Sequence, residues 1–227
     1  MKTNQLNSRR DFLGTLVLGA AVGGISSVIA NPLAEKKPAS VTANLTDPEK
    51  WMEKIKGIHR VVFDGTTAYH GFPVIWNWAF YLTNNQTGVP DEEITAMTVI
   101  RHDAIPLALE DRIWEKYKLG EMFKIDDNIK KAASLRNTVY EPQAGDFPLP
   151  GIDGIKKLQE RGAMFCACDL ALKVYSSFAA KDMGLDDKEV YNEWVNGVLP
   201  DIEIVPSGVW ALGRAQEHGC GYIYAGG

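Results

Sequence analysis

The sequence contains little cysteine and lacks the motifs that mark several large enzyme classes. Only three of its 227 residues are cysteine. Glycine-rich phosphate-binding loops, dinucleotide fingerprints and the motifs of Ser-His-Asp hydrolases are missing. Internal repeats and low-complexity segments are missing as well. A conventional hydrolase or a flavoprotein therefore has no direct support.

Clusters of basic residues are equally scarce. The net charge is -5, and no run of lysine and arginine is longer than a pair such as Arg9-Arg10. This balance argues against nucleic acid and against an anionic membrane surface as partners. What is present, 45% apolar and 23% charged residues, is the composition of a globular protein. The length allows one domain of ordinary size with appendages.

The N-terminal residues predict an export signal. The hexapeptide Ser8 to Leu13 reads Ser-Arg-Arg-Asp-Phe-Leu and precedes a weakly apolar, glycine-rich stretch up to Ala30. It resembles a twin-arginine signal, which sends folded proteins out of the bacterial cytoplasm. The alternative is an uncleaved membrane anchor, but about 17 glycine-rich residues are marginal for a span. We expect a signal peptide over residues 1–34, an exposed leader over 35–57, a periplasmic location and no stable membrane insertion after cleavage.

The stretch from Gly162 to Leu172 predicts a strand, a thiol and a helix in direct succession. Residues 163–168 form a continuous apolar run of strand length, typical of a parallel strand covered on both faces. Asp169 is expected to cap a helix over 170–181. A cysteine at this junction, Cys168, faces the positive end of the helix dipole, which favours a nucleophilic thiolate. The alternative for Cys168, and our preferred interpretation of Cys166, is a buried packing residue.

The other elements alternate between strands and helices. This alternation predicts a mainly parallel sheet with helices on both faces. Further strands are expected over 59–63, 94–100, 202–205 and 220–224, and helices over 70–84, 105–117, 152–161, 186–196 and from the Ser207 cap to Glu217.

Two segments depart from this regular pattern. The helix over 70–84 is apolar around most of its circumference, so we expect it to be buried between the sheet and a neighbouring subunit. An aromatic wall over a ligand is the alternative. The polar, proline-containing segment over about 121–150 is predicted to be an insertion that either covers the site or contacts another subunit.

No structural disulfide is expected. An odd number of cysteines leaves at least one thiol free. Cys166 and Cys168 are predicted to lie on one face of a strand about 6.6 Å apart, whereas bridged Cβ atoms need about 3.8 Å. Cys220 is expected at the opposite edge of the sheet from Cys168.

The C-terminal half resembles the DsrE/DsrF-like (YchN-like) family. The resemblance rests on the strand ending in Cys168 and on Leu199-Pro200, Ile204 to Val209, Arg214 to Glu217 and Gly221 to Ile223. It implies a flavodoxin-like three-layer α/β/α fold with a mainly parallel five-stranded sheet over residues 58–227. It also implies a trimer or hexamer that relays sulfane sulfur as a persulfide on Cys168, with a sulfur compound or a sulfur-relay protein as partner and without a cofactor.

Two features depart from the family pattern. Asp169 follows the cysteine, and its carboxylate opposes ionisation of the thiol unless it is occupied as a helix cap. The insertion and the export signal are absent from the cytoplasmic sulfur relays.

The candidate site lies where the strands end. In a doubly wound sheet, ligands bind outside the carboxyl ends of the strands. A neighbouring arginine and histidine favour a thiolate and suit an anionic sulfur compound, such as thiosulfate, or an acceptor persulfide. The candidate catalytic residue is Cys168, and the candidate substrate-binding residues are Asp64, His70, Arg101, His102 and Ser207.

A non-catalytic periplasmic protein that binds a small molecule, copper or zinc is the rival hypothesis. His70, His102 and Cys168, with or without Asp64, are suitable ligand types. No tight ligand spacing supports such a centre, so no metal site is assigned.

The export signal gives the first prediction. Replacing Arg9 and Arg10 by lysine is expected to leave precursor in the cytoplasm, because the arginine pair is what the twin-arginine pathway recognises. Cell fractionation with immunoblotting measures the periplasmic yield. An unchanged yield would contradict the assignment, since a protein exported by the general secretory route is processed normally after this change.

Overall fold

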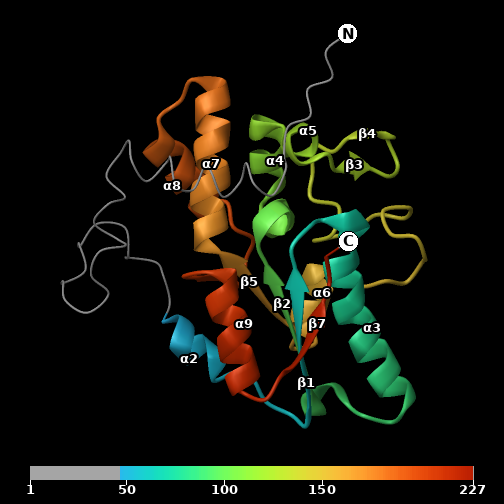
Figure 1. Cartoon of the computed structure of the whole chain (residues 1–227). Helices are drawn as coiled ribbons and strands as arrows, with labels where there is room; N and C mark the ends of the chain where they lie inside the picture. Colours follow the sequence, from blue (N-terminus) through green and yellow to red (C-terminus); the bar gives the residue numbers. More distant parts are fainter. Residues whose placement is uncertain (1–46, 227) are drawn as a thin grey trace, which may run out of the picture. The chain divides into compact units, whose positions relative to one another are not determined.

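The computed structural model describes residues 47–226, so the predicted signal peptide and most of the leader lie outside the described residues. A five-stranded sheet with the order β6-β5-β2-β1-β7 runs through the domain, and every neighbouring pair is parallel. Helices flank both faces (Figure 1). The predicted flavodoxin-like three-layer α/β/α fold is confirmed. The strands are β1 (His59–Gly65), β2 (Ile94–Ile100), β5 (Met164–Cys168), β6 (Ile202–Val205) and β7 (Gly221–Tyr224).

The order of the strands places the end of the chain beside its first strand. β1, β2, β5 and β6 are added in one direction, and β7 then returns to pair with the free side of β1. All residues of β2 and β5 are buried. Continuous apolar runs suit such central strands, because both faces are covered.

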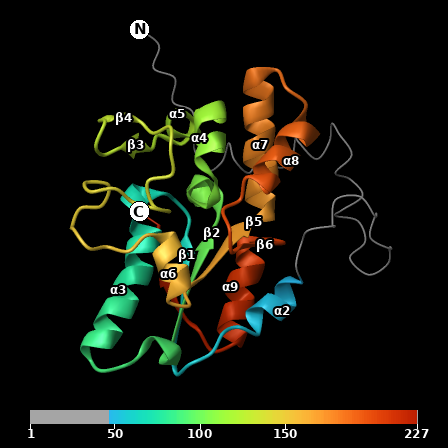
Figure 2. The same ribbon diagram turned by 180° about the vertical axis from the view of Figure 1, so that it is seen from behind.

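The two faces of the sheet bury separate apolar clusters. One face is covered by α3 (Phe72–Gln86) and α6 (Ile155–Glu160), and the other by α2 (Pro48–Met52) and α9 (Gly208–Glu217) (Figures 1 and 2). Successive side chains of β1 point to opposite faces of the sheet, so Val61 and Phe63 belong to the larger cluster and Val62 to the smaller one.

A further group of helices lies beyond the carboxyl ends of the strands (Figure 1). It contains α4 (Asp111–Tyr117), α5 (Leu119–Phe123), α7 (Asp169–Met183), α8 (Asp187–Asn196) and the ribbon of β3 (Asp126–Asp127) and β4 (Ala132–Ala133). Three 3-10 helices complete the described chain: η1 (Tyr69–Gly71), η2 (Asp91–Glu93) and η3 (His102–Ala108). No helix within residues 47–226 is long and apolar enough to cross a membrane.

The predicted continuous helix over 105–117 is wrong. The chain forms η3 with Pro106 inside it, becomes extended at Leu109, and begins α4 only at Asp111. Proline lacks a backbone N–H and disfavours helical geometry in the residue before it. Leu109 then forms an isolated bridge with Val198, which fixes the break.

The aromatic helix keeps one partly uncovered face. α3 begins at Phe72 with proline in its first turn, later than the predicted start at His70. Trp76 remains 43% exposed, and the rings of Tyr69, Phe72 and Trp76 follow one another at 5.2 and 5.3 Å. A partner subunit over this face stays a prediction.

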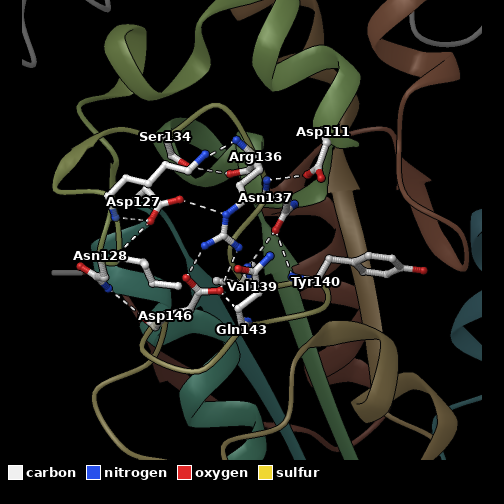
Figure 3. Close-up of polar contacts among 12 residues, drawn as sticks. Asp111, Asp127, Asn128, Ser134, Arg136, Asn137, Val139, Tyr140, Gln143 and Asp146 are labelled. Carbon is white, nitrogen blue, oxygen red and sulfur yellow. Dashed lines mark hydrogen bonds and ion pairs between the residues drawn. The ribbon is translucent and has the colours of Figure 1, made fainter.

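Buried ion pairs organise the insertion. Figure 3 shows the guanidinium of Arg136 between Asp127 and Asp146, with Nε at 2.9 Å from Asp127 Oδ2 and Nη2 at 2.5 Å from Asp146 Oδ1. The side chains of these aspartates are 1% and 0% exposed. Asn137 then donates to the carbonyls of Leu107 and Leu109, which ties the segment to the break before α4. The segment has no apolar periodicity, and ionic and amide contacts hold it in place instead.

Replacing the central cation tests this arrangement. Arg136→Met leaves two buried carboxylates without a counter-charge, and we expect a loss of about 3 to 5 kcal/mol in the free energy of unfolding, measured by chemical denaturation. Lys156→Met, which removes an exposed pair with Glu141, is the control and is expected to leave the stability unchanged. Equal stability of both variants would contradict the role given to Arg136.

The ion pair of Asp127 and Arg136 makes the stability of the protein depend on pH. Burial acts to raise the pKa of Asp127, but hydrogen bonds from Lys130, Arg136 and Ile129 outweigh it and hold the pKa below its usual value. A lowered folded-state pKa stabilises the protein above the unfolded pKa of about 4, and this contribution is lost as the pH falls through the folded pKa. The stability difference between wild type and Arg136→Met should therefore shrink in acid.

Candidate functional site

The predicted sequence of strand, thiol and helix is present, with a shift of one residue at the cap. β5 ends at Cys168, and α7 begins at Asp169. Cys168 has extended backbone angles, and its Sγ accepts a hydrogen bond from the N–H of Ala171 at 3.4 Å. Cys168 itself is therefore the N-cap, and the prediction that Asp169 fills this place is wrong. The backbone stays extended up to Cys168 and is helical from Asp169, so Cys168 stands at the boundary where an N-cap side chain accepts a backbone N–H.

The carboxylate beside the cysteine is engaged elsewhere. Asp169 Oδ2 lies 2.6 Å from Lys173 Nζ, and Tyr191 donates to Oδ1 at 2.6 Å. Burial and then the Asp169 carboxylate raise the pKa of Tyr191, which keeps the phenol protonated as a donor. The negative charge that the sequence placed next to the thiol is thus paired with Lys173.

The three thiols occupy different surroundings, and all of them are free. Cys166 packs in the smaller apolar cluster and Cys168 in the larger one, because the chain leaves the strand at Cys168. In a regular strand, residues two apart lie on the same face, so Cys166 and Cys168 would share one cluster. Here they lie in different clusters. Burial raises the pKa of Cys166 well above its usual value, with smaller effects of Cys168 and Glu203. Burial also raises the pKa of Cys220.

Cys168 ends β5, and Arg101 directly follows the neighbouring strand β2. Ile100 pairs with Ala167, so Arg101 and Cys168 are the next residues along the two chains. The guanidinium of Arg101 donates to both oxygens of Asp64, from Nε at 2.6 Å and from Nη2 at 2.9 Å. These hydrogen bonds are the main cause of a raised pKa of Arg101, and Tyr222 and Cys168 contribute as nearby groups. The thiol is therefore within electrostatic range of the arginine.

Asp64 is a buried carboxylate, and three donors hold it in place. Its side chain is 3% exposed at the end of β1. Besides two bonds from Arg101, Oδ2 accepts the phenol of Tyr222 at 2.9 Å. Tyr222 lies opposite Val62, two residues before Asp64, so both side chains are on the same face of the sheet. Sequence reasoning missed Tyr222, because nothing in the local pattern shows that β7 pairs with β1.

The start of α9 supports Arg101 from the other side. Ser207 Oγ accepts the N–H of Trp210 at 3.2 Å and caps α9, as predicted. The next residue, Gly208, contacts the stem of Arg101, and a Cβ added there would lie 2.6 Å from Arg101 Cδ. Ser207 thus acts as a helix cap beside the site, and Gly208 makes room for the arginine.

The two predicted histidines lie in the 3-10 helices η1 and η3 and have unusual backbone geometry. His102 follows Arg101 with φ 52°, lies 3.3 Å from Asp103 and packs edge to face on Tyr175 of α7. His70 has φ 53° after Tyr69 at φ 28° and is exposed. Left-handed conformations of non-glycine residues cluster at functional loops.

The structure thus brings together part of the predicted set. Asp64, Arg101, Cys168 and Ser207 meet at one edge, His102 is turned towards α7, and no contact within the described residues joins His70 to this group.

Metal ligands and deep cavities are not concentrated at this edge. Among residues 47–226, no three or more His, Cys, Asp and Glu side chains are arranged to hold a metal ion. Two shallow hollows of about 430 and 390 Å³ lie along the insertion, and neither is lined by Cys168 or Arg101. Cys168 is 6% exposed at this edge and the side chain of Arg101 is 26% exposed, so an approaching ligand meets the guanidinium before the thiol.

The reactivity of the three thiols can be ranked. We expect iodoacetamide to alkylate Cys168 at neutral pH before Cys166 and Cys220, because burial raises the pKa of the latter two and Cys168 has a backbone donor and a neighbouring guanidinium. Mass spectrometry of peptides after brief labelling measures the order. Equal labelling of all three thiols would show that Cys168 is a packing residue.

Comparisons with known proteins leave the family open. No protein-family model matches the chain, and no curated protein is significantly similar to it. Among solved structures, it is similar to the protein of unknown function MTH1491 from Methanobacterium thermoautotrophicum. The identity is 17%, the match covers 73% of this chain and 98% of the other, and the TM-score is 0.39. This similarity carries no argument about function, and the resemblance to the DsrE/DsrF-like family stays a prediction.

Proposed function

We propose that this protein carries a sulfane sulfur atom as a persulfide on Cys168 and serves sulfur metabolism as a carrier or sulfurtransferase. The observation that supports this function is the position of Cys168. Its sulfur accepts a backbone hydrogen bond at the start of α7, and Arg101 follows the neighbouring strand. Charge-assisted hydrogen bonds and a nearby cation are the contacts that stabilise thiolates and persulfide anions.

The proposed chemistry is an exchange of one sulfur atom. The Cys168 thiolate attacks the sulfane sulfur of the donor, a new S–S bond forms, and the bond to the rest of the donor breaks with the electron pair leaving on that fragment. The product is a Cys168 persulfide anion. An acceptor thiolate then attacks the terminal sulfur, which restores the Cys168 thiolate.

The cellular setting of the proposal comes from the sequence. A twin-arginine signal over residues 1–34 would place the carrier in the periplasm. The partly uncovered aromatic face of α3 favours a homo-oligomer, a trimer or a hexamer, because soluble proteins bury such surfaces.

A binding protein without catalysis is the second candidate. The aromatic row of Tyr69, Phe72 and Trp76, of which Tyr69 and Trp76 are exposed, favours it, since such rings form walls of small-molecule sites. A copper or zinc ligand set is less favoured, because both oxygens of Asp64 are occupied by Arg101.

Sulfur loading separates the two candidates. After incubation of the purified protein with polysulfide, we expect the peptide that contains Cys168 to gain the mass of one sulfur atom and to lose it on reduction. Cys168→Ser should abolish the gain, and Cys220→Ser is the matched control that should retain it. If no sulfur is gained, or if Cys220 is loaded equally, the hypothesis of a binding protein replaces that of a sulfur carrier.

A further inference from the structure

Arg101 differs from the other well-buried arginines in how it uses its nitrogens. Arg136 and Arg161 are 14% and 21% exposed, and each engages Nε, Nη1 and Nη2 with protein acceptors. Arg101 is 26% exposed and uses Nε and Nη2 on Asp64. For its Nη1, no acceptor is found within residues 47–226. A guanidinium that is built into the fold therefore keeps one edge of donors unused.

The unused edge has a fixed position. The two bonds to Asp64 set the plane of the guanidinium, and the stem of Arg101 is packed on Gly208. Tyr222 donates to the same carboxylate and draws part of its negative charge away from the arginine. A preorganised donor edge loses little entropy when an anion binds.

We propose that the Nη1 edge of Arg101 binds the anionic end of the sulfur donor, an inorganic sulfur oxyanion such as thiosulfate, and that Tyr222 is a positioning residue for Arg101. The identity of this donor rests on the proposed function of Cys168. The forked geometry of a guanidinium matches two oxygens of one anion. Tyr222 touches Asp64 and acts on the donor only through it.

The assignment fits the sulfur exchange. With its sulfonate oxygens on Arg101, thiosulfate presents its outer sulfur to the thiolate of Cys168, which ends the neighbouring strand. The thiolate forms the new S–S bond, the S–S bond of thiosulfate breaks, and sulfite leaves with the electron pair. The thiolate and thiosulfate together carry three negative charges, and so do the persulfide and sulfite that they form. Arg101 faces the negative charge that develops on the sulfite.

Anion binding can be measured without the sulfur reaction. In the Cys168→Ser background, thiosulfate and sulfate are titrated into the purified protein by calorimetry. We expect Arg101→Lys to weaken binding about tenfold, or about 1.4 kcal/mol, because the fork is lost. Tyr222→Phe keeps the ring and should weaken binding by a smaller, measurable factor. Tyr224→Phe is the matched control on the same strand, since the hydroxyl of Tyr224 is bonded to Thr66, whereas the Asp64 carboxylate accepts from Tyr222.

A measurement on the unmodified protein guards against variants that fail to fold. Sulfate and thiosulfate should both slow the alkylation of Cys168 and leave that of Cys220 unchanged. Equal affinity in Arg101→Lys, or no protection of Cys168, would overturn the inference.

The two proposals fail in different ways. Sulfur loading on Cys168 from polysulfide, together with no binding that depends on Arg101, would remove the anion site and leave the carrier function standing. Binding that depends on Arg101 without any sulfur loading would remove the carrier function. Equal binding by Tyr222→Phe and Tyr224→Phe would remove the positioning role of Tyr222.

Discussion

The buried carboxylate of Asp64 is the constraint on which the carboxyl end of the sheet depends. A charge with a 3% exposed side chain is tolerated only when it is paired and hydrogen-bonded. Its partners are Arg101, which directly follows β2, and Tyr222 of β7, so one side chain links β1 to both of its neighbours in the sheet. Arg101, held in this way, lies beside the end of β5, where the chain places Cys168. The geometry of the thiol site thus follows from how one carboxylate is neutralised.

The same type of contact is used for a different purpose in the insertion. Arg136 is neutralised by two buried carboxylates and donates to them from all three nitrogens of its guanidinium. Such an arginine is a structural centre, because each of its nitrogens already donates to a carboxylate. Arg101 is held by one carboxylate and retains Nη1. The number of occupied nitrogens, rather than burial alone, distinguishes the arginine that stabilises from the arginine that can bind.

Much of the fold could be predicted from the sequence, because apolar runs and caps are local signals. The buried strands β2 and β5, the Ser207 cap and the thiol at the start of α7 all follow from short patterns. Long-range pairing has no such signal. The neighbour of β1 could not be foreseen, and Tyr222 was missed with it. Pro106 was present in the sequence, but the break in the helix also depended on the bridge between Leu109 and Val198, which are far apart in the sequence.

Among the described residues, seven residues other than glycine have left-handed backbone conformations, and one of them, His102, directly follows Arg101. The left-handed conformations of His70, in η1 after β1, and of His102, at the start of η3 after β2, cost about 1 to 3 kcal/mol each. Both segments follow strands whose apolar residues are buried, and this packing supplies the stability that maintains the strain. His102 lies between two attachments, because Arg101 before it is bonded to Asp64 of β1 and Asp103 after it accepts a hydrogen bond from Tyr175 of α7. The left-handed residue thus stands where the chain passes from a contact with β1 to a contact with α7.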